Sequence, residues 1–480
     1  MTESAHRRWL ALYLLCLGEL MIVLDTTIVN VALPSIRQDL GFSETSLAWV
    51  VNAYMITYGG LLLLGGKLGD LYGQRRMFLF GLVLFTAASL ACGLSGSPGL
   101  LIAARLVQGM GGAVVSAVAL ALIMTLFTEE GDRAKAMGVY GFVCAAGGSI
   151  GVLTGGFLTG TFDWHWTFLV NLPVGLAVFA LSLWLLPEAP GGAAGERLDI
   201  AGAVSVTLAT MLAVYAVVNG NEAGWGSVQT LGLLACAAVL FVAFIVIEGR
   251  LATPLMPLAL FRLPSVAVSN AIGVLWAAGM FAWFFLSALY LQRVLDYTPM
   301  QVGLAFLPSN LLMAAFSLGL SAKIVMRFGL RVPIAVGMAL SAVALALFAV
   351  APVQGGFWLH VFPGMMLLGL GCGMALNPVL LAAMSEVQPH EAGLASGIVN
   401  TAFMLGGALG LAVLASLAAA RSGFMLAGGA GEPAALLGGY HAAFWVAAGF
   451  AAVAAVLPFL LPRAPASASA AGPAPSRHPG

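Results

Sequence analysis

Long apolar runs follow one another along almost the whole chain, and short segments that carry most of the charges separate them. Each run is about 18–25 residues long, the length at which an α-helix crosses the roughly 30 Å hydrocarbon core of a bilayer. A membrane β-barrel would instead show strands of about ten residues with alternating polarity. The pattern therefore predicts an all-α integral membrane protein.

Marking the runs gives fourteen expected spans, and no loop between them is long enough to hold a folded soluble domain. The spans fall near residues 9–31, 47–66, 77–95, 99–126, 135–158, 165–186, 200–219, 228–248, 265–290, 300–322, 332–351, 357–383, 393–418 and 440–461.

Composition agrees with this assignment. Charged residues are 8% of the chain and apolar residues are 61%, whereas a soluble protein carries roughly 25% charged residues. The five cysteines fall within predicted spans without the spacing of a disulfide framework or a metal site. We expect no metal and no cofactor. We also find no phosphate-binding glycine loop and no metalloprotease motif, which argues against an enzyme or an ATP-driven pump.

Basic residues predict the orientation. With both termini in the cytoplasm, 15 of the 19 Lys and Arg residues fall on cytoplasmic segments, Arg105 falls inside a span, and only Arg37, Arg293 and Arg421 fall outside. This bias follows the positive-inside rule and supports an even number of spans. We therefore expect a multi-pass protein of the cytoplasmic (inner) membrane.

Three ionisable residues lie deep in the predicted spans: Glu19, Asp25 and Arg105. Each costs at least a few kcal/mol in hydrocarbon unless it is paired or hydrated, so such residues are functional candidates. From the helix rise, Asp25 lies about 24 Å and Arg105 about 22 Å above the inner boundary, so the two are level. They form either a proton-exchanging pair or a static ion pair that fixes two helices.

A weak internal repeat relates the two halves of the chain. The run from Gly66 to Arg76 (GKLGDLYGQRR) follows span 2, and the run from Met326 to Arg331 (MRFGLR) follows span 10. Parallel repeats of this kind are known in transporters. The alternative is that any tight turn between helices uses glycine and basic residues.

The first run resembles the loop 2–3 signature of the major facilitator superfamily. Three further stretches resemble its fourteen-span drug:proton antiporters. They are LDTTIVNVALP at 24–34, RLVQGMGG at 105–112 and WHWTFLVNLPVG at 164–175. The span-5 antiporter motif departs from the family pattern, because Val152 stands where the family has proline; this leaves open whether coupling is altered.

The resemblance implies two six-helix halves, residues 1–186 and 265–462, with a linker and two inserted spans at 187–264 between them. Residues 463–480 are Ala/Pro/Ser-rich, and we expect a disordered cytoplasmic tail. The implied function is export of drug-like or antibiotic molecules by alternating access, driven by proton entry. A monomer in the lipid bilayer suffices, and no nucleic-acid partner is expected. The alternatives are a metabolite uptake or symport carrier of the same fold, and a non-transporting membrane receptor or enzyme.

The resemblance also assigns candidate roles. It implies that Asp25 and Arg105 couple transport to protons. It also implies that the residues of the loop between spans 2 and 3 form a conformational latch. A third group, in span 5, would pack against the other half of the molecule. The latch residues are Gly66, Asp70, Gly73, Arg75 and Arg76, and the packing residues are Gly147, Gly151, Gly155 and Gly156. The alternative for the loop is a positively charged membrane anchor.

The expected substrate cavity draws on polar and aromatic residues of several spans. Its candidates are Glu19, Asn30, Gln108, Trp283 and Phe284. Aromatic rings suit flat, hydrophobic or cationic ligands, although aromatic residues that face lipid are also common. Glu19 is the candidate partner of a cationic substrate; alternatively it is a protonated acid that bonds to a neighbouring helix.

Overall fold

The computed structural model of the chain describes residues 2–43, 45–187, 199–251, 254–316, 320–387 and 392–462. Within these ranges the chain forms helices joined by short connections, and no strand is present. Thirteen of the described helices are long and apolar enough to cross a membrane. The expected tail at 463–480 and the linker residues 188–198 lie outside the described ranges.

The helices follow the predicted runs in order. The first part of the chain forms α1 (Thr2–Leu40), α2 (Trp49–Tyr72), α3 (Gln74–Gly93), α4 (Pro98–Leu126), α5 (Glu130–Thr161), a short α6 (Trp166–Leu169) and α7 (Asn171–Leu185). The middle forms α8 (Ile200–Ala223) and α9 (Val228–Arg250). The remainder forms α10 (Pro264–Arg293), α11 (Pro299–Ala315), α12 (Ser321–Phe328), α13 (Arg331–Phe348), α14 (Phe362–Met384), α15 (Ala392–Ala427) and α16 (Glu432–Val456).

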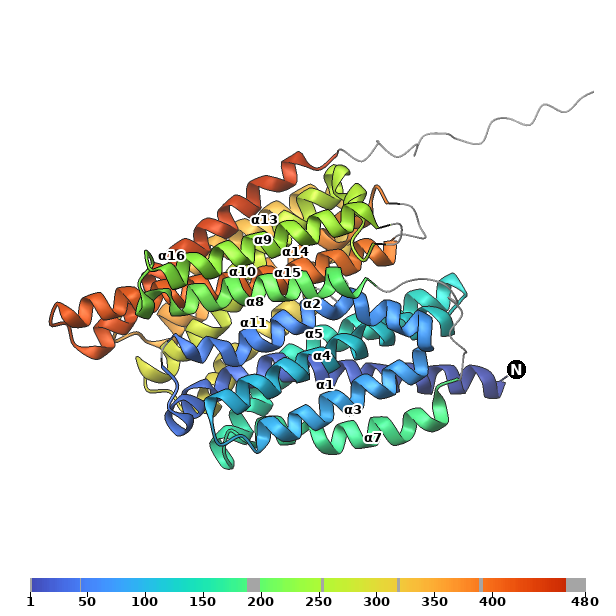
Figure 1. Ribbon diagram of the computed structural model, residues 1–480, viewed down its shortest axis with the longest axis horizontal. Coiled ribbons are helices and arrows are strands. Elements are labelled where there is room, and N and C mark those ends of the chain that lie inside the picture. Colours follow the sequence, from blue (N-terminus) through green and yellow to red (C-terminus); the bar gives the residue numbers. More distant parts are fainter. Residues whose placement is uncertain are drawn as a thin grey trace, which may run out of the picture.

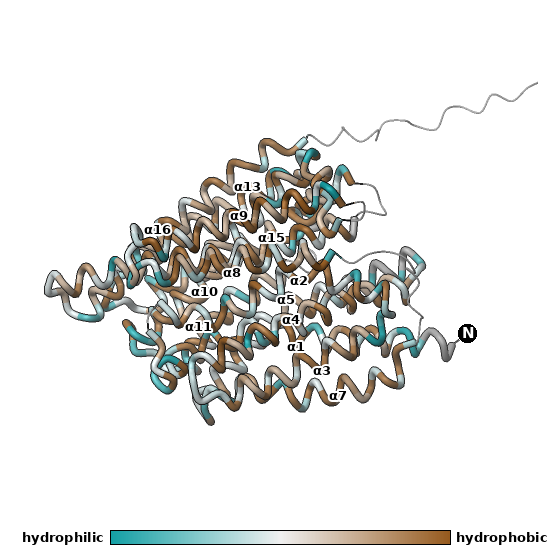
Figure 2. Tube along the Cα trace, in the orientation of Figure 1, coloured by the Kyte–Doolittle hydropathy of each residue, from teal (hydrophilic) through white to brown (hydrophobic). Residues whose placement is uncertain are grey.

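The prediction of an all-α membrane fold is therefore confirmed. The span expected near 300–322 begins as α11 and runs into residues 317–319, which lie outside the described ranges. Figure 2 shows apolar residues along most of the helical lengths, with hydrophilic residues mainly near helix ends and connections. This distribution is the one that a lipid environment requires, because polar groups there must be paired within the protein.

Local sequence signals fix several helix starts. Thr298 and Gln301 form a reciprocal capping box at the start of α11, in which each side chain bonds to the other residue's backbone N–H. Asp199 caps α8, because its Oδ1 accepts a hydrogen bond of 2.7 Å from Gly202 N. Proline opens α4, α10 and α11, where its missing N–H costs nothing.

The helices pack mainly with neighbours from the same part of the chain (Figure 1). In the first part α4 packs against α2 and α3, and α1 packs against α5; in the last part α10 packs against α15 and α13 against α14. Two interfaces join these groups, α2 with α15 and α5 with α11. The inserted helix α8 pairs with α9 and also contacts α2 and α15. We call the side where α1 begins the amino-terminal face, and the side where it ends the opposite face.

Candidate functional site

A buried ion pair joins α1 to α4. Asp25 is 0% exposed and Arg105 is 1% exposed, and Arg105 Nη1 forms a salt bridge with Asp25 Oδ2. Because α4 starts at the opposite face, a residue near its beginning lies level with a residue in the second half of α1. The structure thus places together the two residues that the helix rise put at equal depth.

Amide side chains complete the surroundings of Asp25. Gln108 Nε2 donates a hydrogen bond of 2.7 Å to Asp25 Oδ1, and Asn171 Nδ2 donates one of 3.1 Å to the same oxygen. Gln108 Oε1 in turn accepts a bond of 2.6 Å from Arg105 Nη1, and its Nε2 also reaches Ser89 Oγ at 2.8 Å. Both carboxylate oxygens therefore accept hydrogen bonds, and Gln108 contacts both members of the ion pair.

The guanidinium of Arg105 is held by more than Asp25. Its Nε donates a bond of 2.9 Å to the backbone oxygen of Val50 in α2. Its carbon lies 4.5 Å from the ring centre of Tyr54 and 5.6 Å from that of Phe168, which is within the range of cation–π attraction. A buried ion pair is stable only with such additional partners, since both charges lose their hydration.

The sequence identified some members of this network and missed others. Asp25, Arg105 and Gln108 were all candidates from the sequence. Gln108, however, was expected to line the substrate cavity, and in the structure it bonds to the ion pair. Asn171 stands inside the stretch at 164–175 that marked the family resemblance, so its signal was present but unused. Ser89 carried no signal, because a lone hydroxyl within an apolar run is common and usually bonds to its own helix.

Glu19 lies in a separate buried position nearer the amino-terminal face. It is 4% exposed, and its Oε2 has no hydrogen-bond partner among the described residues. Ser116 of α4 and Tyr140 of α5 face its carboxyl group, and Tyr58 of α2 lies close by. The Glu19 carboxyl group on α1 therefore points toward α2, α4 and α5.

The remaining cavity candidates have local partners. Asn30 is buried and donates a hydrogen bond of 3.1 Å to the backbone oxygen of Thr26, one turn earlier in α1. Trp283 is 1% exposed and packs edge-on against Phe306, with ring centres 5.2 Å apart. Phe284 stacks on the same Phe306 ring at 5.5 Å. These two aromatic residues form part of the packed core of α10 and α11, and their contact with substrate stays a prediction.

The candidate latch lies at the junction of α2 and α3 on the amino-terminal face. Gly73 forms this junction with φ of +93°, a conformation that residues with a side chain rarely adopt. Asp70 and Arg76 are exposed beside it. Gly66, about two helical turns before Gly73, has open space around it, since an added methyl group would approach only Ala117, at 3.9 Å.

The second copy of the repeat has the same local geometry. Gly329, between α12 and α13, also has a positive φ, +72°. Arg75 follows the first glycine by two residues and donates a bond of 2.6 Å to Leu183 O near the end of α7. Arg331 follows Gly329 by two residues and donates to Leu461 O, just after α16. The two stretches aligned in the sequence thus form equivalent turns, each tied to the last helix of its part of the chain.

The glycine stripe of α5 packs in a direction that the sequence did not predict. Gly147, Gly151 and Gly155 were expected to face the other half of the molecule. Instead they face α1: a methyl group on Gly151 would overlap the hydroxyl of Thr27 and lie 3.0 Å from Leu24 O. The expectation was wrong because four-residue spacing predicts a groove but not which helix fills it.

The neighbouring face of α5 makes the contact with α11. A methyl group on Gly156 would lie 2.7 Å from the backbone oxygen of Pro299, and one on Gly303 would lie 2.9 Å from Val152 O. Val152, the residue that replaces the motif proline, is 1% exposed at this interface. Glycine is thus needed on both helices where α5 and α11 cross.

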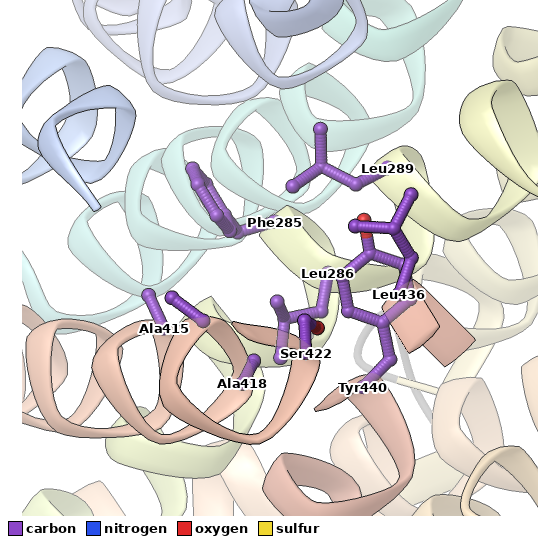
Figure 3. Close-up of a pocket in the computed structure, with 9 residues that line it drawn as sticks. Phe285, Leu286, Leu289, Ala415, Ala418, Ser422, Leu436 and Tyr440 are labelled. Atoms are coloured by element: carbon purple, nitrogen blue, oxygen red, sulfur yellow. The ribbon is translucent and has the colours of Figure 1, made fainter. Parts of the chain in front are cut away.

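Two recesses of the described structure lie away from this network. Figure 3 shows one among α10, α15 and α16, where Phe285, Leu289, Ala415 and Tyr440 converge. It measures about 20 Å³, which is room for one water molecule but not for a drug-sized ligand. A second, of about 430 Å³, opens at the opposite face and includes Glu222 in its lining. Asp25 lines neither.

Comparison with known proteins places this arrangement in a family. The chain is 39% identical to the puromycin resistance protein of Streptomyces alboniger, over 93% of this chain and 88% of that one. It is 38% identical to the cephamycin export protein of Amycolatopsis lactamdurans, over 96% and 94%. It is 34% identical to the tetracenomycin C resistance and export protein of Streptomyces glaucescens, over 87% and 77%.

A solved structure shares the fold. A crystal structure of a mutant of the nucleoside transporter NupG superposes with a TM-score of 0.66, at 13% identity, over 94% of this chain and 99% of that one. At that identity the likeness concerns the fold alone. The sequence profile described as Major Facilitator Superfamily matches residues 15–411. The chain therefore belongs to the major facilitator superfamily.

Proposed function

We propose that this protein exports antibiotic-like organic molecules across the cytoplasmic membrane in exchange for protons. The names of three relatives that match most of the chain support the export of antibiotics. The observation that supports proton coupling is the fully buried carboxylate of Asp25 on α1, whose partners come from two other helices, α4 and α7. An acid at such a position is costly unless it has a functional role.

The hydrogen bonds of Asp25 suit the ionised carboxylate. Its two oxygens accept from Arg105, Gln108 and Asn171, and an ionised carboxyl group is an acceptor only. A proton on Asp25 would remove the charge that holds Arg105 and would turn an O–H toward donors. Protonation therefore weakens several bonds at once, which gives the proton a direct effect on helix packing.

The helices around Asp25 connect it mechanically to the other part of the chain. Its partners lie on α4 and α7, and Arg105 also bonds to Val50 O of α2. Helix α2 packs in turn against α15, from the other part of the chain. When Asp25 takes up a proton, a loosened α1–α4 contact shifts α2 against α15. Return of the proton to the cytoplasm restores the bonds seen here.

The proposed cycle uses the division expected from the sequence. Residues 1–186 and 265–462 act as two halves that rock about the α2–α15 and α5–α11 interfaces, with α8 and α9 inserted between them. Both termini face the cytoplasm, so the amino-terminal face is the cytoplasmic one. A monomer contains all of these parts.

Export and its energy source are tested together in drug-sensitive bacterial cells. Cells that express the chain are exposed to cationic, neutral and anionic antibiotics, with and without a protonophore. The proposal predicts resistance and low drug accumulation that the protonophore abolishes. The control variant is Asp296→Asn, which removes an exposed acid at a left-handed turn position that asparagine tolerates. It retains full resistance, whereas Asp25→Asn loses it.

Uptake or receptor function gives different results in the same cells. An uptake carrier raises the accumulation of its substrate and does not confer resistance. A receptor or enzyme changes accumulation in neither direction. Resistance that survives the protonophore would contradict proton coupling while leaving export intact.

A further inference from the structure

Two further acids are buried at the base of the inserted helices, outside the Asp25 network. Asp199 stands at the start of α8 and is 4% exposed, and Glu248 stands near the end of α9 and is 2% exposed. Both lie toward the amino-terminal face. Two buried carboxyl groups that face one another need an explanation, because each loses its hydration there.

Each acid uses one oxygen for a backbone bond and turns the other toward its neighbour. Asp199 Oδ1 accepts from Gly202 N at 2.7 Å, and Glu248 Oε2 accepts from Met256 N at 3.0 Å. The other oxygens, Asp199 Oδ2 and Glu248 Oε1, are buried and have no donor among the described residues. A methyl group on Gly202 would overlap the first and lie 2.9 Å from the second, so both converge on one point.

The same cluster connects the inserted helices to α2. Lys67, from the candidate latch region, faces Glu248, and its Nζ donates a bond of 3.4 Å to Pro254 O in the segment after α9. Glu248 holds Met256 of that segment. The start of α8, the end of α9, the segment that leads to α10 and the cytoplasmic end of α2 therefore meet here.

Charge balance indicates what lies between the two oxygens. Two ionised carboxylates this close repel one another, and a pair that shares a site holds one proton between them. One carboxylate, one carboxylic acid and the ammonium of Lys67 together are electrically neutral, which suits a buried site. We propose that Asp199 and Glu248 form a second proton-binding site, and that its shared proton clamps the inserted helices to α2.

The proposed clamp responds to the proton concentration on the amino-terminal face. Among the described residues, the charged groups that face Glu248 are Asp199 from α8 and Lys67 from α2, while Arg250 on α9 itself is exposed. At low proton concentration the shared proton leaves, the two carboxylates repel, and the base of α8 and α9 separates. The site takes up no substrate and is independent of whether the protein exports drugs.

Amide variants distinguish a shared proton from ordinary packing. Glu248→Gln supplies a permanent N–H donor to Asp199, so the hydrogen bond between the two side chains no longer needs the shared proton. Asp199→Asn supplies such a donor to Glu248 and still caps α8. Glu248→Ala removes the bridge. Arg250→Gln is the control, since it changes an exposed charge two residues away.

The measurement is a spin-label distance between two exposed positions, Tyr72 at the end of α2 and Leu251 after α9, in full-length protein in lipid nanodiscs. We expect the wild type and Arg250→Gln to give a narrow distance distribution at mildly acidic pH and a broad one at mildly alkaline pH. The distance distribution of Glu248→Gln and of Asp199→Asn is expected to stay narrow at both pH values. That of Glu248→Ala is expected to stay broad at both. A wild-type distribution that does not change with pH, or an amide variant that responds as the wild type does, would overturn the proposal.

Discussion

Gln108 and Arg105 both donate to Asp25, one to each oxygen of its carboxylate. They are three residues apart on α4, so they lie on the same face of the helix. Gln108 Oε1 also accepts from Arg105, at 2.6 Å. The α4 helix thus presents a preassembled pair of donors to α1, and a change in either donor alters the other.

Removing either charge alone is expected to cost more than removing both. Arg105→Gln leaves Asp25 as an uncompensated buried charge, and Asp25→Asn does the same to Arg105, each at about 3–5 kcal/mol. The double variant Asp25→Asn/Arg105→Gln leaves no charge and is expected to be more stable than either single variant. Thermal unfolding in detergent micelles measures this order. Additive losses in the double variant would show that the two groups do not act as a pair.

Asn171 is expected to contribute to the same network from α7. Asn171→Leu removes one donor from Asp25 and costs about 1–3 kcal/mol of stability, and it lowers pH-gradient-driven transport. Thr167→Ala is the matched control, because that buried hydroxyl donates to Trp164 O nearby in the chain and not to the Asp25 network among the described residues. Transport and unfolding temperature are measured for both variants. If the two variants have equal transport, the bond from Asn171 has no role in coupling.

Glu19 is predicted to select for positive charge on the substrate. Its Oε2 is buried and has no hydrogen-bond partner in the part of the chain that the structure describes, so a cationic group would supply a hydrogen bond and a balancing charge. Glu19→Gln is expected to reduce export of cationic compounds several-fold more than export of neutral ones. Efflux of paired cationic and neutral dyes measures the ratio. An equal loss for both kinds of dye would reject this role.

Asp70 is predicted to bias the conformational balance through the latch beside Gly73. Asp70→Asn removes a charge at an exposed position, so folding should be unaffected. Spin-label distances between the ends of α2 and α15 at the amino-terminal face are expected to shift toward the open state. Distances that match the wild type would leave the loop as a membrane anchor only.

The sequence predicted those features that depend on length and spacing. Apolar runs located the spans because a helix must cross a fixed thickness of hydrocarbon, and the helix rise put Asp25 level with Arg105. The repeat predicted two equivalent turns, and both Gly73 and Gly329 have positive φ.

Features that depend on how one helix rotates against another were not predictable. Spacing alone did not show that Gly151 faces Thr27 of α1 rather than α11. Nor could it show that Asn171 of α7 bonds to the Asp25 carboxylate, while Ser89 of α3 accepts a bond from Gln108. Several helices converge on these contacts, and a single sequence carries the pattern of each helix separately.

The most direct test of the account measures proton-coupled transport by purified protein in liposomes. A pH gradient, acidic on the side that corresponds to the cell exterior, should drive a transported antibiotic uphill toward that side in the wild type. Asp25→Asn, reconstituted in equal amount and orientation, is predicted to lose this gradient-driven accumulation entirely, while Asp296→Asn retains it. Full uphill transport by Asp25→Asn would contradict the assignment of Asp25 as the proton carrier.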